Sequence, residues 1–297
     1  MHLMLCTVHA QTLNDLLKVA TSKVYFDNFK AAIVDLNKII AENSNSLEVT
    51  RAYYLRGRSF AGLKMSKQAL QDYNYAIQLD SNNVEAYNYK GILFLEEQKP
   101  VEALMAFNNA IERNPTYVDA YNNRSNALLK LNKHQSALED INKVLAASPN
   151  NIEAILLSAS IKRFMNDVNG AIDDCNTAIQ INEYATKAYL IKADIRLTLG
   201  DHKAAISDLN KAIEVEDSNE FVYYQLGNTY LSMQNFKNAI KFYNKAISLN
   251  DQDASFYLQR GLAKQKINDK QGSCADFTRA ADLGSAQGNE FKKTYCK

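Results

Sequence analysis

The sequence lacks several features that point to particular classes of protein. Tryptophan is absent, and the 297 residues include only 3 prolines and 10 glycines, which leaves little room for linkers. The 34 basic residues nearly balance the 33 acidic ones, so no positive excess indicates a nucleic-acid partner. No apolar run reaches the roughly 18 residues that a membrane-spanning helix needs. With 46% hydrophobic residues, we expect an ordered chain with a packed interior and no integral membrane segment.

The sequence instead contains one segment that returns at a fixed interval. Near copies of 205–213 recur every 34 residues from Ala69 to Ser273. The small and apolar residues of this segment fall at helical spacing. An upstream helical pattern that includes Tyr189 stops at Gly200, a residue suited to closing a helix in the left-handed conformation. Each unit is therefore predicted to be a helical hairpin. Because a lone hairpin cannot bury both apolar stripes, stacked hairpins forming an α-solenoid are expected.

Fixed positions within the unit carry a family resemblance. One copy reads Tyr223, Gly227, Tyr230, Ala239, Tyr243 and Ala246, and another copy ends in Pro115. This pattern resembles the tetratricopeptide repeat. The resemblance implies an all-α solenoid, a right-handed superhelix of helical hairpins, that acts as a scaffold for a protein or peptide partner. We expect a possible signal peptide over residues 1–10, one continuous array of eight repeats over 11–285, and a capping helix over 286–297.

The resemblance also implies where a partner would bind. In this family the first helices line a concave groove, and the matching positions here are Tyr54, Arg58, Asn88, Asn122, Asn126, Asp194, Tyr224 and Asn228. We expect these side chains to be free, because the hairpin stripe does not need them, and Asn can both donate to and accept from a peptide backbone. Asn is also common on any solvated helix face, so that interpretation stays open. The next row, which includes Tyr89 and Asn123, does not reproduce the long Asn ladder of O-linked N-acetylglucosamine transferase.

Two alternative functions follow from other parts of the sequence. The convex face or the ends of the array could assemble a cell-envelope complex, with second helices such as 241–245 and its lysines as the contact surface. An enzyme would need converging catalytic groups, and no phosphate loop or serine nucleophile motif occurs. His134 and His202 fill equivalent positions two repeats apart, roughly 20 Å if each repeat advances by about 10 Å, so one metal ion cannot join them. We expect no catalytic residue, no metal and no cofactor.

The two ends of the chain raise the question of compartment. The apolar start ends in Val8-His9-Ala10, which fits a secretory cleavage site, although an N-terminal helix extension is the alternative. The C-terminal segment looks like the closing turn of exported bacterial repeat proteins. In an oxidising compartment Cys274 and Cys296 would form a disulfide, and otherwise they would be two thiols. A periplasmic or secreted location is therefore expected, with the cytoplasm as the alternative.

Overall fold

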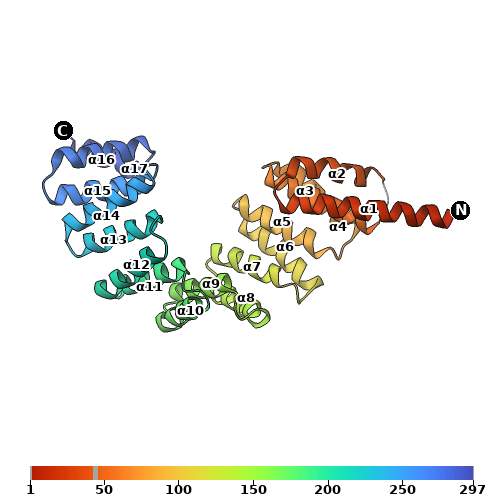
Figure 1. Ribbon diagram of the computed structural model, residues 1–297, viewed down its shortest axis with the longest axis horizontal. Coiled ribbons are helices and arrows are strands. Elements are labelled where there is room, and N and C mark those ends of the chain that lie inside the picture. Colours follow the sequence, from red (N-terminus) through yellow and green to blue (C-terminus); the bar gives the residue numbers. More distant parts are fainter. Residues whose placement is uncertain (1, 43–45, 297) are drawn as a thin grey trace. The chain divides into compact units, whose positions relative to one another are not determined.

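The computed structural model describes residues 2–42 and 46–296, with side chains described from residue 13 onward. Within these ranges the chain forms seventeen α-helices and no strand (Figure 1), which confirms the predicted all-α fold. Contacts between the helices divide the chain into two units, residues 1–149 and 150–297. Each unit is described by itself. The single continuous array over residues 11–285 stays a prediction.

Unit 1 consists of antiparallel helix pairs in chain order. Its described helices are α1 (His2–Tyr25), α2 (Phe29–Ala41), α3 (Leu47–Gly62), α4 (Ser66–Leu79), α5 (Val84–Glu96), α6 (Pro100–Arg113), α7 (Val118–Lys130) and α8 (His134–Ala147). The backbone of residues 2–10 is the beginning of α1, and the side chains of these residues, like residue 1, lie outside the described set. The proposed leader therefore stays a prediction.

Unit 2 repeats the same arrangement and adds one helix. Its helices are α9 (Ile152–Phe164), α10 (Val168–Ile181), α11 (Thr186–Thr198), α12 (His202–Val215), α13 (Glu220–Ser232), α14 (Phe236–Leu249), α15 (Ala254–Lys266), α16 (Lys270–Asp282) and α17 (Ala286–Tyr295). The free thiol of Cys175 is buried in α10, and burial raises its pKa to about 12. This cysteine is therefore an inert core residue, as its apolar repeat position predicts.

Every hairpin turn closes in the same way. One residue per turn has a positive φ, and these residues are Asp27, Lys64, Gln98, Asn132, Asn166, Gly200, Gln234 and Asn268. In the turn at Gln98 the Lys99 amide donates to the Phe94 carbonyl over 2.8 Å, which ties the end of α5 to the start of α6. The predicted left-handed closure at Gly200 is confirmed by its φ of 76°. The other turns adopt it with residues that tolerate it less well.

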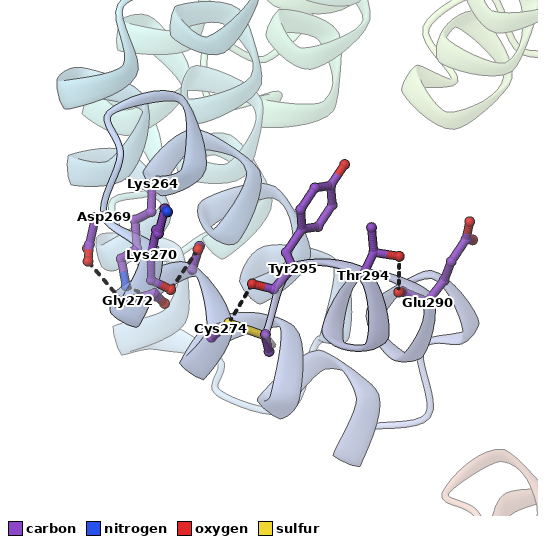
Figure 2. Close-up of a disulfide and its surroundings, with 10 residues drawn as sticks. Lys264, Asp269, Lys270, Gly272, Cys274, Glu290, Thr294 and Tyr295 are labelled. Carbon is purple, nitrogen blue, oxygen red and sulfur yellow. Dashed lines mark hydrogen bonds between the residues drawn. A yellow bond between two sulfur atoms is a disulfide. The ribbon is translucent and has the colours of Figure 1, made fainter.

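The last helix covers the open end of unit 2. The Phe277 ring of α16 packs against Phe291 and Tyr295 of α17, with ring centroids 5.4 and 6.0 Å apart. Cys274 and Cys296 are joined by a disulfide with their Cα atoms 5.3 Å apart (Figure 2). Together the ring cluster and the covalent bond attach α17 to the final hairpin, as a solenoid end requires.

Candidate functional site

A cluster of tyrosines lies on the first helices of unit 1. We call Tyr54 of α3, Tyr89 of α5, Tyr117 before α7 and Arg58 of α3 the tyrosine face. The rings of Tyr54 and Tyr89 are stacked with centroids 6.1 Å apart and planes 12° from parallel. The Arg58 guanidinium lies 5.2 Å from the Tyr89 ring centroid. The Tyr117 hydroxyl interacts electrostatically with Tyr89 and Tyr54, and α5 contacts both α3 and α7, so three consecutive repeats contribute to one surface.

The surroundings of Tyr54 and Tyr117 keep the phenols of these two residues protonated. Burial raises the pKa of Tyr54, and the Glu85 carboxylate raises it further, although Arg51 opposes the shift. Burial also raises the pKa of Tyr117, with a further contribution from Asp119. Both hydroxyl groups therefore remain neutral at physiological pH. They can donate a hydrogen bond to a carbonyl oxygen of a partner.

A cavity of about 210 Å³ adjoins the tyrosine face. Its lining consists of Asp27, Phe29, Arg58, Ala61, Gly62, Tyr73, Tyr89, Ile92, Leu93 and Glu96. This lining combines apolar walls with one cation and two carboxylates. Pockets for drug-sized ligands usually reach about 300–1,000 Å³. The smaller volume here suits one side chain of a longer partner.

Two of the three asparagines expected to form a free ladder, Asn88 and Asn126, have side-chain hydrogen bonds within the protein. Asn88 is only 3% exposed, and its Oδ1 accepts a hydrogen bond from Asn123 Nδ2 over 3.0 Å. Asn126 Nδ2 donates to the backbone carbonyl of Asn122 over 3.1 Å. The expectation that Asn88 is free is therefore wrong. Asn123 of α7 lies one position after Asn122, the equivalent of Asn88 in the next repeat. Because α5 and α7 are in contact, the Asn123 side chain faces α5 and bonds to Asn88.

The predicted binding residues of unit 2 also make internal contacts. Asp194 of α11 forms an ion pair with Arg163 of α9, with 2.6 Å between Oδ2 and Nη1. The buried Tyr243 hydroxyl donates to Asn228 Oδ1 over 2.8 Å, and the Tyr224 ring lies 5.9 Å from the Tyr243 ring. The expectation that the polar groups of Asp194 and Asn228 are free is therefore wrong, whereas a binding role for Tyr224 stays a prediction. A buried phenol requires an acceptor, and Asn228 provides it.

The partner-binding residues predicted from the sequence include Tyr54 and Arg58 of the tyrosine face but not Tyr89 and Tyr117, and their role in binding stays a prediction. Tyr89 belongs to the row that lacks an Asn ladder, so it was not considered as a contact residue. Tyr117 occupies the helix-cap position that Asn83 fills in the preceding repeat. An exposed-face tyrosine in adjacent repeats is the signal that could have identified both.

The lysines of α14 have aromatic neighbours. Lys241 Nζ lies 5.6 Å from the Phe242 ring centroid, and Lys245 Nζ lies 5.6 Å from the Tyr223 ring centroid.

Among the described residues, no three His, Cys, Asp or Glu side chains are grouped closely enough to hold a metal ion. Nor does any described helix combine the length and hydropathy needed to cross a membrane.

Family models of the tetratricopeptide repeat match four segments of the chain, residues 54–116, 106–139, 186–219 and 221–253. Together these segments cover just over half of the sequence. Among curated proteins, none matches the chain at a significant level.

Solved structures share the fold at low sequence identity. A tetratricopeptide repeat protein from Parabacteroides merdae is 19% identical with a TM-score of 0.70, over 84% of this chain and 99% of that one. The C-terminal part of a repeat protein from Cytophaga hutchinsonii is 15% identical with a TM-score of 0.60, over 81% of this chain and 97% of that one. A chain of the APC/C hetero-tetramer Cut9-Hcn1 is 14% identical with a TM-score of 0.61, over 95% of this chain and 55% of that one. The repeat pattern, the helical hairpins and the matches to four family models together show that the chain belongs to the tetratricopeptide repeat family.

Proposed function

We propose that the protein is a non-catalytic scaffold that binds an extended segment of a partner protein on the tyrosine face of unit 1. Tetratricopeptide repeats generally mediate interactions between proteins. The observation that carries the proposal is the stack of Tyr54, Tyr89 and Arg58 beside the 210 Å³ cavity. Rigid aromatic rings and arginine are the side chains that most often dominate binding energy at protein interfaces.

Arg58 is well suited to contact a partner because it can be removed without exposing a buried charge. Its neighbour Arg56 instead binds Asp72 through Nε and Nη2, both at 2.8 Å. Truncation of Arg56 would leave a buried carboxylate unpaired, whereas Arg58 has the Tyr89 ring beneath it. Arg58 is therefore proposed to contact a partner, whereas Arg56 stabilises the fold.

A random-peptide display selection against the full chain, followed by fluorescence anisotropy, tests the proposal. We expect micromolar peptides whose affinity falls at least tenfold, about 1.4 kcal/mol, in the triple variant Tyr54→Ser, Arg58→Ser, Tyr89→Ser. Tyr184→Ser is the matched control, since Tyr184 is an exposed tyrosine of unit 2. Circular dichroism and thermal melting establish that each variant is folded. Peptides that bind the folded triple variant as tightly as the parent would refute the tyrosine face.

We also propose that the protein is exported, with residues 1–10 as its leader. The disulfide between Cys274 and Cys296 supports this, because such bonds persist in oxidising compartments. N-terminal sequencing of the mature protein from its native cell tests the proposal. A mature chain that still begins at Met1 would contradict it.

Assembly of an envelope complex through the second helices is the second candidate function. The exposed apolar side chains of α4 and α6, Tyr75, Val101 and Met105, favour it. Crosslinks to partners that map to second helices, with none on the tyrosine face, are the outcome that would replace the first proposal by this one.

A further inference from the structure

An ion pair between the first and second helix recurs in several hairpins. It occurs as Arg56 with Asp72, Arg124 with Asp140, and Arg260 with Asp276, at 2.8, 2.6 and 2.5 Å. Each of these aspartates is at most 3% exposed. Each arginine also donates to an asparagine of the preceding second helix, as Arg124 does to Asn108 over 2.8 Å. The basic side chain thus has two partners, one acidic and one neutral.

The third hairpin keeps the base but lacks the acid. Lys90 of α5 stands at the arginine position and donates to Asn74 Oδ1 over 2.8 Å, as its equivalents do. The position of the aspartate is occupied by Ala106 of α6, which is 5% exposed. Among the described residues, no carboxylate lies within ion-pair distance of Lys90. Burial lowers the pKa of Lys90, which is the expected response of a cation without a counterion.

A cavity of about 210 Å³ lies where the carboxylate is missing. Its lining consists of Tyr87, Lys90, Phe94, Glu102, Met105, Ala106 and Asn109, and we call it the Lys90 pocket. In the seventh hairpin both members of the pair are replaced by apolar residues, Leu226 and Phe242, and Leu226 is fully buried. The third hairpin differs because a cation and an open space remain together.

We propose that the Lys90 pocket receives an acidic side chain from a protein segment that docks across α4 and α6. The missing carboxylate defines the chemistry of the occupant, because repeats of the same chain show which group this position binds. A glutamate or aspartate would supply to Lys90 the counterion that Asp72 supplies to Arg56. The apolar walls from Tyr87 and Phe94 would contact its methylene groups.

The surroundings favour a polypeptide over a free small acid. Val101 and Met105 of α6 are 54% and 62% exposed, and Tyr75 of α4 is 44% exposed. A second hollow of about 430 Å³ is lined by Lys67, Leu70, Gln71, Asn74, Tyr75 and Gln78. Asn74 lines this hollow and also bonds to Lys90, so the two depressions adjoin. A single carboxylic acid would leave most of this apolar surface uncovered.

Glu102 allows the charge preference of the Lys90 pocket to be tested. Its carboxylate lines the Lys90 pocket and would repel an acidic occupant. The Arg113 guanidinium lies 4.3 Å from the Tyr87 ring centroid and donates to Asn109 Oδ1, so it adds positive charge next to two residues of the pocket lining. Neutralising Glu102 should therefore strengthen the binding of an acid and weaken the binding of a base.

The probe is a blocked peptide with one glutamate beside one phenylalanine, and its control has glutamine in place of glutamate. The full chain, methyl-labelled at alanine, is titrated by NMR. We expect the Ala106 methyl signal to shift with a Kd near 1 mM for the glutamate peptide, about −4 kcal/mol. The glutamine peptide should bind at least fivefold more weakly. Equal binding of the two peptides would overturn the proposal.

Three variants test the residues of the pocket. Ala106→Asp rebuilds the ion pair of the other hairpins inside a folded protein, and it should abolish binding while thermal stability is kept or raised. Because this variant lacks the Ala106 methyl, its binding is read from saturation transfer to the phenylalanine ring of the peptide. Lys90→Met should also abolish binding, whereas Glu102→Gln should strengthen it about twofold or more. Lys293→Met, a lysine of α17, is the control. Retained binding by folded Ala106→Asp, or weakened binding by Glu102→Gln, would refute the proposal.

This inference goes beyond the binding proposed for the tyrosine face, because it concerns the surface of α4 and α6. It names an acidic side chain as the group bound there, which the second candidate function leaves open. The triple variant of the tyrosine face should leave the glutamate-peptide titration unchanged. Failure of one proposal therefore does not decide the other.

Discussion

Two kinds of hairpin occur in this chain, and they differ in the side chains that fill the space between the two helices. In the first kind, glycine of the first helix faces an aromatic ring of the second, as Gly57 with Tyr73, Gly91 with Phe107, Gly227 with Tyr243 and Gly261 with Phe277. In the second kind, a small side chain stands opposite an aliphatic or thiol side chain, as Ala20 with Leu36, Ser125 with Ile141, Ala159 with Cys175 and Ala193 with Leu209.

The geometry shows why the two positions must change together. A Cβ atom built at Gly91 would lie 2.4 Å from Phe107 Cε1, closer than atoms can pack. At the equivalent pair Ala193 and Leu209, both residues are essentially fully buried in one cluster. The pair, rather than either position, is therefore the unit of packing. A larger partner on one helix requires a smaller one on the other.

The largest expected effect comes from removing the aromatic ring from a hairpin of the first kind. Phe107→Ala should lower the free energy of unfolding of unit 1 by about 3–5 kcal/mol, whereas Cys175→Ala should lower that of unit 2 by about 1 kcal/mol. Urea unfolding measures the stability loss of each variant. Because repeat proteins need not unfold in one step, amide exchange of α5 and α6 shows where the stability lost in Phe107→Ala is located. Equal losses would contradict the division into two kinds of hairpin.

The final aromatic hairpin has an additional constraint, which can be removed separately. Replacing Cys274 and Cys296 by serine should reduce the stability of α16 and α17 by about 3 kcal/mol, since the bond closes a loop with a sequence separation of 22. The Phe277 ring would then lose part of its cover. Amide exchange in α17 measures the effect. Reductant added to the double variant is the control and should change nothing further.

A methyl group added at the glycine should have an intermediate effect that depends on its partner. Gly91→Ala should lower stability by about 1–3 kcal/mol through overpacking, despite a gain in helix propensity of about 1 kcal/mol. Combining it with Phe107→Leu, which copies Ala193 and Leu209, should recover part of the loss. A double-mutant cycle by urea unfolding measures the coupling. Strictly additive effects would show that the two positions do not share one volume.

The smallest expected effect lies in the turns, which both kinds of hairpin share. Gln98 has a φ of 59°, a conformation in which glycine is favoured over residues with a Cβ. Gln98→Gly should raise the melting temperature, with a gain of about 0.5–1 kcal/mol. Asn166→Gly should gain less, because Asn tolerates this conformation. A loss in both variants would mean that the turn side chains make contacts of their own.

Much of the fold could be predicted from the sequence because it depends on local periodicity. The recurrence of segments such as 205–213 determines the helix pairs, and Gly200 marks a turn without any tertiary information. The candidate site could be predicted only in part. Tyr54 and Arg58 follow from their repeat position, but the role of Tyr89 depends on the rotation of α5 against α3, which the pattern of one repeat does not contain.

The sequence by itself determined that this chain is a series of helical hairpins, because side-chain spacing along one helix is enough to define its buried stripe. Only the tertiary structure decided which polar groups remain available to a partner. Asn88 and Asn122 occupy equivalent positions, yet Asn88 Oδ1 is bonded to Asn123, and Lys90 is left without the acid that its equivalents have. Hydrogen bonds and ion pairs depend on the neighbouring helix, so equivalent positions in different repeats can have different chemistry.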